Sequence, residues 1–167
     1  GVDLLVGART GELDLLLYSV FHVGQPVSNI TTQTADDIRT LPMVDWVVPI
    51  SLGDSHKGYR VTATTSEYFE KVKLRNEQLM TFSQGRAFKR LNEVVIGSEV
   101  ANALNYALGD KVYLSHGTSG LPGSTHDDFA FEVVGIIEPT GTPTDRVLLI
   151  DPICVGIVSG QTDRVDR

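Results

Sequence analysis

The residues best suited to chemistry in this sequence are three consecutive ones, His126, Asp127 and Asp128. An imidazole and two carboxylates can hold a divalent metal, and His56 or His116 could supply a further ligand. Adjacent side chains on an extended chain diverge, however, so consecutive residues rarely bind one ion. The alternative is a polar beginning of a strand, where an aspartate fixes the local backbone. The pattern favours that alternative and leaves His126 and Asp127 as weak metal candidates.

Nucleophilic catalysis has little support in the sequence. Ser119, His126 and Asp127 can be combined into a triad on paper, but no G-x-S-x-G motif is present to expose a strained nucleophile. Cys154 lies in an apolar stretch without a basic neighbour that would lower its pKa, which is typical of a buried, inert thiol. We therefore expect a protein that is not an enzyme and that needs no cofactor.

Two glycine-rich stretches predict loops. Gly53 and Gly58 have the outer spacing of a phosphate-binding loop, but Tyr59 and Arg60 follow where Lys and Ser or Thr are needed, so a hairpin turn is favoured. Residues 116–123 (HGTSGLPG) follow a strand without opening a helix, which favours a mobile loop over a ligand-binding one. Four side chains of this region could contact a partner: His116, Ser119, His126 and Asp128.

Composition limits the class of protein. The 167 residues carry a formal charge of −7, and the 14 Lys and Arg residues are dispersed, so neither nucleic acid nor an anionic membrane surface is an expected partner. No stretch reaches the roughly 18 apolar residues of a membrane helix. The chain opens without Met. These features predict a soluble piece excised from a longer protein.

Apolar spacing and turn residues predict an α+β fold. Two expected helices cover residues 12–21 and 31–41. A third begins at Thr64, with Glu67 at capping-box spacing, and further helices begin at Ser98 and Asp151. The expected strands cover residues 2–6, 44–52, 59–64, 93–96, 111–114, 129–137 and 147–150.

Several runs, in order, resemble the periplasmic core domain of MacB-like ABC-transporter permeases. They are DLLVGAR (3–9), FH (21–22), NI (29–30), VPISLGDS (48–55) with GYRV (58–61), QGRAF (84–88), VIGSEVA (95–101), HDDF (126–129), VVGII (133–137) and PTGTP (139–143) with DR (145–146). The sequence departs from the family pattern at residues 9–12 (RTGE) and at Ser28. The resemblance covers nearly the whole chain.

The resemblance implies a discontinuous α+β porter-like subdomain with an inserted, β-rich sabre-like subdomain. The first part of the porter-like subdomain would be residues 1–80, the insertion 81–138, the return segment 139–160, and 161–167 a tail leading toward the next membrane helix. The whole permease would lie in a bacterial inner membrane, with this segment in the periplasm.

The function implied by the resemblance is mechanical. This non-catalytic domain would couple ATP-driven motion of membrane helices to export or release of a substrate, or to a periplasmic partner. Its expected partners are a cytoplasmic ATP-binding subunit, a second permease copy in a homodimer, and a periplasmic adaptor or lipoprotein. The alternative is a free-standing periplasmic binding module for a peptide or lipid, with a cleft between its subdomains.

Overall fold

The computed structural model describes residues 4–7, 12–22, 30–74, 77–114 and 130–154, and within them the protein is α+β, as the sequence predicted. The helices are α1 (Glu12–Ser19), α2 (Thr32–Arg39), α3 (Glu67–Lys71), α4 (Ser98–Leu104) and the 3-10 helix η2 (Pro143–Arg146). The strands are β1 (Ile50–His56), β2 (Tyr59–Thr64), β3 (Phe82–Gly85), β4 (Glu93–Ile96), β5 (Lys111–Tyr113), β6 (Ala130–Ile137) and β7 (Val147–Ile150).

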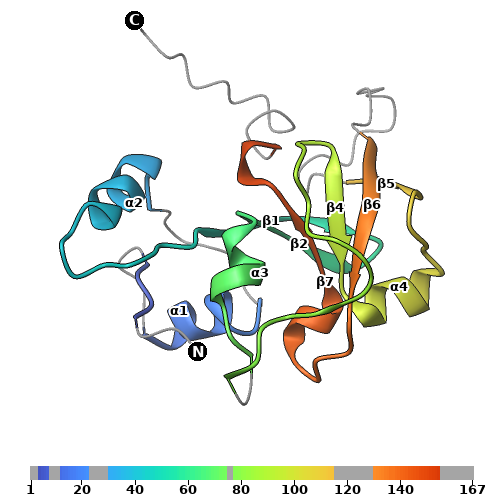
Figure 1. The fold of residues 1–167 in the computed structure, drawn as a ribbon, viewed down its shortest axis with the longest axis horizontal. Helices are drawn as coiled ribbons and strands as arrows, with labels where there is room; N and C mark the ends of the chain where they lie inside the picture. The colour runs from blue at the N-terminus through green and yellow to red at the C-terminus, as the bar shows by residue number, and fades with distance from the viewer. Residues whose placement is uncertain (1–3, 8–11, 23–29, 75–76, 115–129, 155–167) are drawn as a thin grey trace, which may run out of the picture.

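The described strands form one mixed sheet in the order β1-β2-β7-β4-β6-β3, and β5 also pairs with β6. The β1–β2 and β4–β7 pairs are antiparallel, whereas β2–β7 and β4–β6 are parallel. Figure 1 shows α1 and α2 on the side of the molecule away from β5 and α4. Strand β7, from the predicted return segment, lies between β2 and β4. One sheet therefore contains strands from all three predicted segments, 1–80, 81–138 and 139–160. The division into subdomains stays a prediction.

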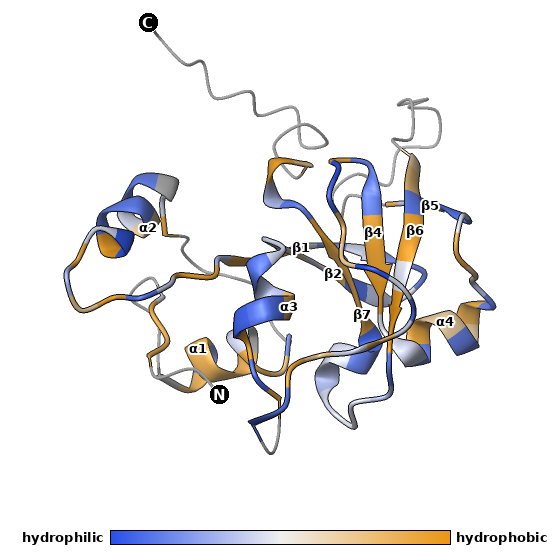
Figure 2. Cartoon of the chain, viewed as in Figure 1, coloured by the Kyte–Doolittle hydropathy of each residue, from blue (hydrophilic) through white to orange (hydrophobic). Residues whose placement is uncertain are grey.

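The sheet is apolar on both faces, because the central strands alternate their side chains between two cores. Val94 and Ile96 of β4 join one core with Leu148 of β7, and α4 covers this core with Val100 and Ala101. The other core takes Val95 and Leu149, with the aromatic side chains of α3 and the following segment: Tyr68, Phe69, Phe82 and Phe88. Figure 2 shows the resulting apolar colour along β4, β6 and β7.

Strands β4 and β7 have the predicted bounds, and α2 begins and ends within the predicted residues. The Thr31 hydroxyl caps α2 by accepting the Thr34 N–H at 3.1 Å. At the end of β7, the Asp151 carboxylate accepts the Ile153 N–H at 2.9 Å, so the predicted helix start at Asp151 is confirmed.

Three local predictions were wrong. Residues 4–7 form no strand, and β1 begins at Ile50, later than expected, and runs through Gly53 to His56. A register shift between Leu52 and Ser55 lets the strand absorb these turn-type residues, so the hairpin turn is reduced to Lys57 and Gly58. The predicted capping box at Thr64 is absent: the Thr64 hydroxyl donates to the Pro49 carbonyl at 2.7 Å, and the N-cap of α3 is Ser66, two residues later.

Candidate functional site

The candidate metal ligands do not come together in the described part of the chain. His116, Ser119, His126, Asp127 and Asp128 all lie outside the described residues. Within the described residues, no group of three or more His, Cys, Asp or Glu side chains could hold an ion. The further ligand suggested for such a site, His56, uses both ring nitrogens in hydrogen bonds within the fold. The metal-ligand role suggested for His56 stays a prediction, although a metal there would have to replace one of these hydrogen bonds.

His56 instead joins the tip of the β1–β2 hairpin to the segment from α4 to β5. Its Nδ1 lies 2.7 Å from the Tyr113 carbonyl oxygen, which can only accept, so Nδ1 carries the proton. Its Nε2 then accepts from the Tyr106 hydroxyl at 2.8 Å. The Tyr106 oxygen in turn accepts from Lys57 Nζ at 3.1 Å. Burial lowers the pKa of His56, the Tyr113 carbonyl opposes this, and Lys57 lowers the pKa further, so the ring is neutral at pH 7.

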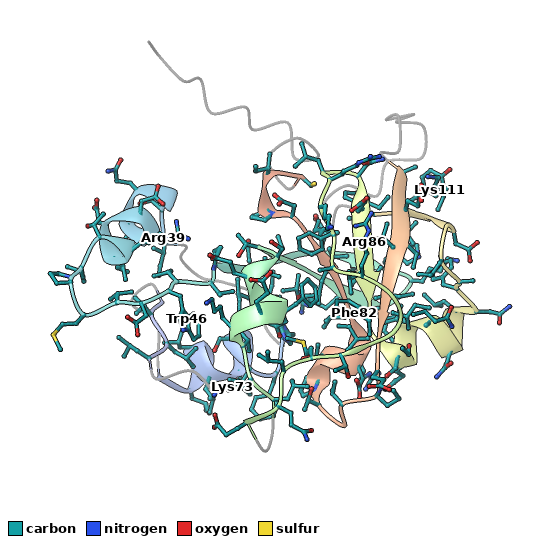
Figure 3. The ribbon with its side chains drawn as sticks, in the orientation of Figure 1. Arg39, Trp46, Lys73, Phe82, Arg86 and Lys111 are labelled. Carbon is teal, nitrogen blue, oxygen red and sulfur yellow. The ribbon has the colours of Figure 1, made fainter. Side chains whose placement is uncertain are left out.

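A second set of polar contacts involves Arg86 of the QGRAF motif, which binds the carboxylate of Glu93. The guanidinium of Arg86 donates to both carboxylate oxygens of Glu93, at 2.9 and 2.8 Å, and the Lys89 N–H donates to the same carboxylate at 2.7 Å. Figure 3 shows Arg86 beside β4 and β6. These bonds, foremost those from Arg86, lower the pKa of Glu93 to about 2. The buried carboxylate thus fastens the chain after β3 to the beginning of β4.

An apolar face of α1 points into solvent. Leu13, Leu16, Leu17, Val20 and Phe21 follow helical spacing, yet all are exposed, Leu13 by 67%. Leu4 and Val6 are exposed as well, in the segment that precedes α1 and approaches Leu15 of that helix at Gly7. The apolar colour of α1 is visible in Figure 2. Several exposed apolar side chains on one helix make this region a candidate interaction site. We call these seven exposed side chains the α1 face.

Two buried side chains, His22 and Cys154, have strongly shifted pKa values. His22, next to the α1 face, is 5% exposed and lies with Nδ1 3.3 Å from the Thr62 hydroxyl. Burial first, and the charge of Arg60 second, lower the pKa of His22 to about 4. Cys154 is fully buried, as predicted, and burial raises the pKa of its thiol to about 11. Neither group is placed to exchange protons with a ligand at neutral pH.

A shallow polar groove of about 320 Å³ lies between β3 and α4. Ser83 and Gln84 form its β3 wall, and Asn102 and Asn105 form its α4 wall. Ile136 of β6 and Tyr106 of the His56 network also line it. Tyr106 is the lining residue with a titratable side chain, and its hydroxyl is already hydrogen bonded. The groove can therefore offer neutral donors and acceptors but no ionic contact from its walls.

The comparisons with known proteins agree with this fold. The family model of the MacB-like periplasmic core domain matches residues 7–163. The chain belongs to the family of MacB-like periplasmic core domains. No curated protein sequence matches the chain significantly. Among solved structures, the crystal structure of the extracellular domain of the noncanonic ABC-type transporter YknZ from Gram-positive bacteria is similar, with a TM-score of 0.56 at 14% identity, over 79% of this chain and 67% of that one.

Membership in the MacB-like family confirms the resemblance found in the sequence, and the likeness to the YknZ domain confirms the fold class. No described helix of this domain is long and apolar enough to cross a bilayer. Tyr106, Asn102 and Asn105 were not among the site residues predicted from the sequence. The two asparagines fall on the polar side of the helix predicted to begin at Ser98. That position could have indicated that their side chains are available to a ligand.

Proposed function

We propose that this chain is the extracytoplasmic domain of an ABC-transporter permease and that it transmits motion instead of catalysing a reaction. The observation that carries the proposal is the match of the MacB-like periplasmic core domain to residues 7–163. The proposed partners are a cytoplasmic ATP-binding subunit, a second permease copy and an extracytoplasmic adaptor or lipoprotein, and the parent protein would lie in the inner membrane.

Two features of the fold support a mechanical role. The sheet continues from β2 through β7 into β4 and β6, so a force applied at one end of the domain reaches the other through backbone hydrogen bonds. His56 adds a side-chain link between the hairpin tip and β5. The α1 face supports a contact with the remainder of the parent protein, because apolar side chains of this number gain free energy when covered.

The location is tested by cysteine labelling of the parent protein in spheroplasts. Met43 is 95% exposed, so Met43→Cys should react with a membrane-impermeant maleimide without lysis. The unsubstituted protein is the control, because Cys154 is buried and its thiol has a pKa raised to about 11. Labelling of Met43→Cys only after lysis would contradict an extracytoplasmic location. Recovery of the protein in the soluble periplasmic fraction would support the free-standing binding module instead.

The coupling role is tested on the purified complete transporter. Spin labels on Met43→Cys of two permease copies report the distance between the two domains. We expect this distance to differ between the nucleotide-free state and the state with a non-hydrolysable ATP analogue. An identical distance distribution in both states would contradict coupling, while leaving the location of the domain intact.

A further inference from the structure

The groove between β3 and α4 has the architecture of a site that takes an extended peptide. A strand at the edge of the sheet and a helix both contribute lining residues, and so does the apolar side chain of Ile136 in the neighbouring strand β6. Among the described strands, β3 pairs only with β6, so its other edge has no strand partner. Ser83, Gln84 and Gly85 are exposed along it. An exposed strand edge can accept a further strand, with main-chain hydrogen bonds giving the affinity.

The side chains of the groove match the main chain of a peptide. The amides of Gln84, Asn102 and Asn105 can each donate and accept, which is what the alternating N–H and C=O groups of an extended chain require. Ile136, which also lines the groove, offers an apolar contact to a side chain of such a segment. The volume of about 320 Å³ accommodates a short peptide segment, and two of the four β3 residues, Ser83 and Gln84, line it.

The charges around the groove define the ligand further. Ionic side chains that neighbour the lining residues in the sequence have partners: Glu99 pairs with Arg146 at 3.1 Å, Arg86 pairs with Glu93 at 2.8 Å, and the Glu138 carboxylate accepts from the Thr81 hydroxyl. An ionic ligand would therefore lose hydration without gaining a free counter-charge from the groove walls. The complementary ligand is uncharged along the part that enters.

We propose that this groove binds an extended, uncharged segment of a partner polypeptide, which pairs with the free edge of β3. The identification of that partner as an extracytoplasmic protein of the transporter rests on the proposed function. The groove itself is tested on the 167-residue domain without the membrane part. A failure here and a failure of the labelling experiment above are therefore distinguishable.

The test is a titration of the ¹⁵N-labelled domain with a capped hexapeptide that alternates threonine and valine, followed by NMR. We expect shifts in the backbone amides of residues 83–85 and in the side-chain amides of Asn102 and Asn105. The same peptide with N-methylated backbone nitrogens should bind at least roughly tenfold more weakly, because its donors are removed. Equal binding of both peptides, or no shift at millimolar peptide, would overturn the proposal.

Matched variants on one helix locate the site. Asn102→Trp fills the groove and should weaken peptide binding at least roughly tenfold, whereas Ala103→Trp, one residue on and not part of the lining, should leave it unchanged. Equal effects of the two variants would contradict the location. A neutral oligosaccharide that shifts the same amides while the peptide does not would also overturn the proposal, because amides and a tyrosine can bind sugars as well.

Discussion

His56 Nδ1 lies 2.7 Å from the carbonyl oxygen of Tyr113, a residue 57 positions later in the chain. His56 ends β1, at one edge of the sheet, and Tyr113 ends β5, which pairs only with β6 among the described strands. One imidazole therefore connects two strands that share no backbone pairing. The sheet is curled enough that strands β1 and β5 approach each other at this end.

Removal of this imidazole should weaken the fold. His56→Ala loses the bonds to Tyr113 and Tyr106 and removes a buried ring from its packing, so we expect a loss of about 1–3 kcal/mol in the free energy of unfolding. Urea denaturation at pH 7.5 measures it. Tyr106→Phe is the control that keeps the Tyr113 bond, and it should cost less. Equal stability of wild type and His56→Ala would show that the link carries no free energy.

His22 makes the stability depend on pH in a defined window. Its pKa is about 4 in the fold and 6.5 in the unfolded chain, so the unfolded state binds more protons between these values. Stability is therefore full above pH 6.5 and falls as the pH drops toward 4, by about 3 kcal/mol in all. Urea denaturation of wild type and His22→Gln between pH 7.5 and 4.5 measures the difference.

The His22→Gln variant should show a flatter pH profile than wild type in that window. Some slope remains, because the pKa of His56 is also lowered and acts with the same sign. Glu93 contributes mainly below pH 4.5, since its pKa falls from 4.5 to about 2, and so lies outside the window. Parallel profiles of the two proteins would contradict the assignment to His22.

Two ion pairs of equal length should differ in their contribution. Both Arg86–Glu93 and Lys111–Glu132 have an N–O distance of 2.8 Å, but the Glu93 side chain is 7% exposed and that of Glu132 is 44%. Glu93→Gln should cost about 2–3 kcal/mol, because Arg86 loses its partner and two backbone N–H groups lose a charged acceptor. Lys111→Ala should cost less than about 1 kcal/mol. Thermal denaturation compares them, and similar losses would refute the argument from burial.

Gly85 and Gly58 provide a further matched pair, because both have positive φ values, +75° and +87°. A Cβ at Gly85 would collide with the Val134 carbonyl, which accepts the Arg86 N–H, whereas nothing lies within 4 Å of one at Gly58. Gly58→Ala should therefore cost only about 1 kcal/mol of backbone strain. Gly85→Ala should cost about 3 kcal/mol or more and disturb the β3–β6 pairing. Hydrogen exchange of the β6 amides checks the second effect.

Local patterns predicted much of the fold. Residues 93–96 and 147–150 are short runs of mainly apolar residues bounded by turn residues, and both were predicted as strands. Every residue of the two strands is buried in the structure. Helix α2 was predicted within residues 31–41, which are followed by Pro42, whereas its Thr31 cap was seen only in the structure. The local sequence of these elements favours the secondary structure that they adopt, so tertiary contacts do not override it.

The candidate site was less predictable. The sequence by itself determined the α+β class, the family and the burial of Cys154, because these depend on local composition and ordered motifs. Only the tertiary structure decided that β1 continues through Gly53, that His56 meets Tyr113, and that Gln84 faces Asn102 across a groove. Each of these depends on contacts between residues far apart in the chain. The apolar spacing of α1 predicted a helix, but not that its apolar face would point outward, because spacing defines a face and only packing decides what it meets.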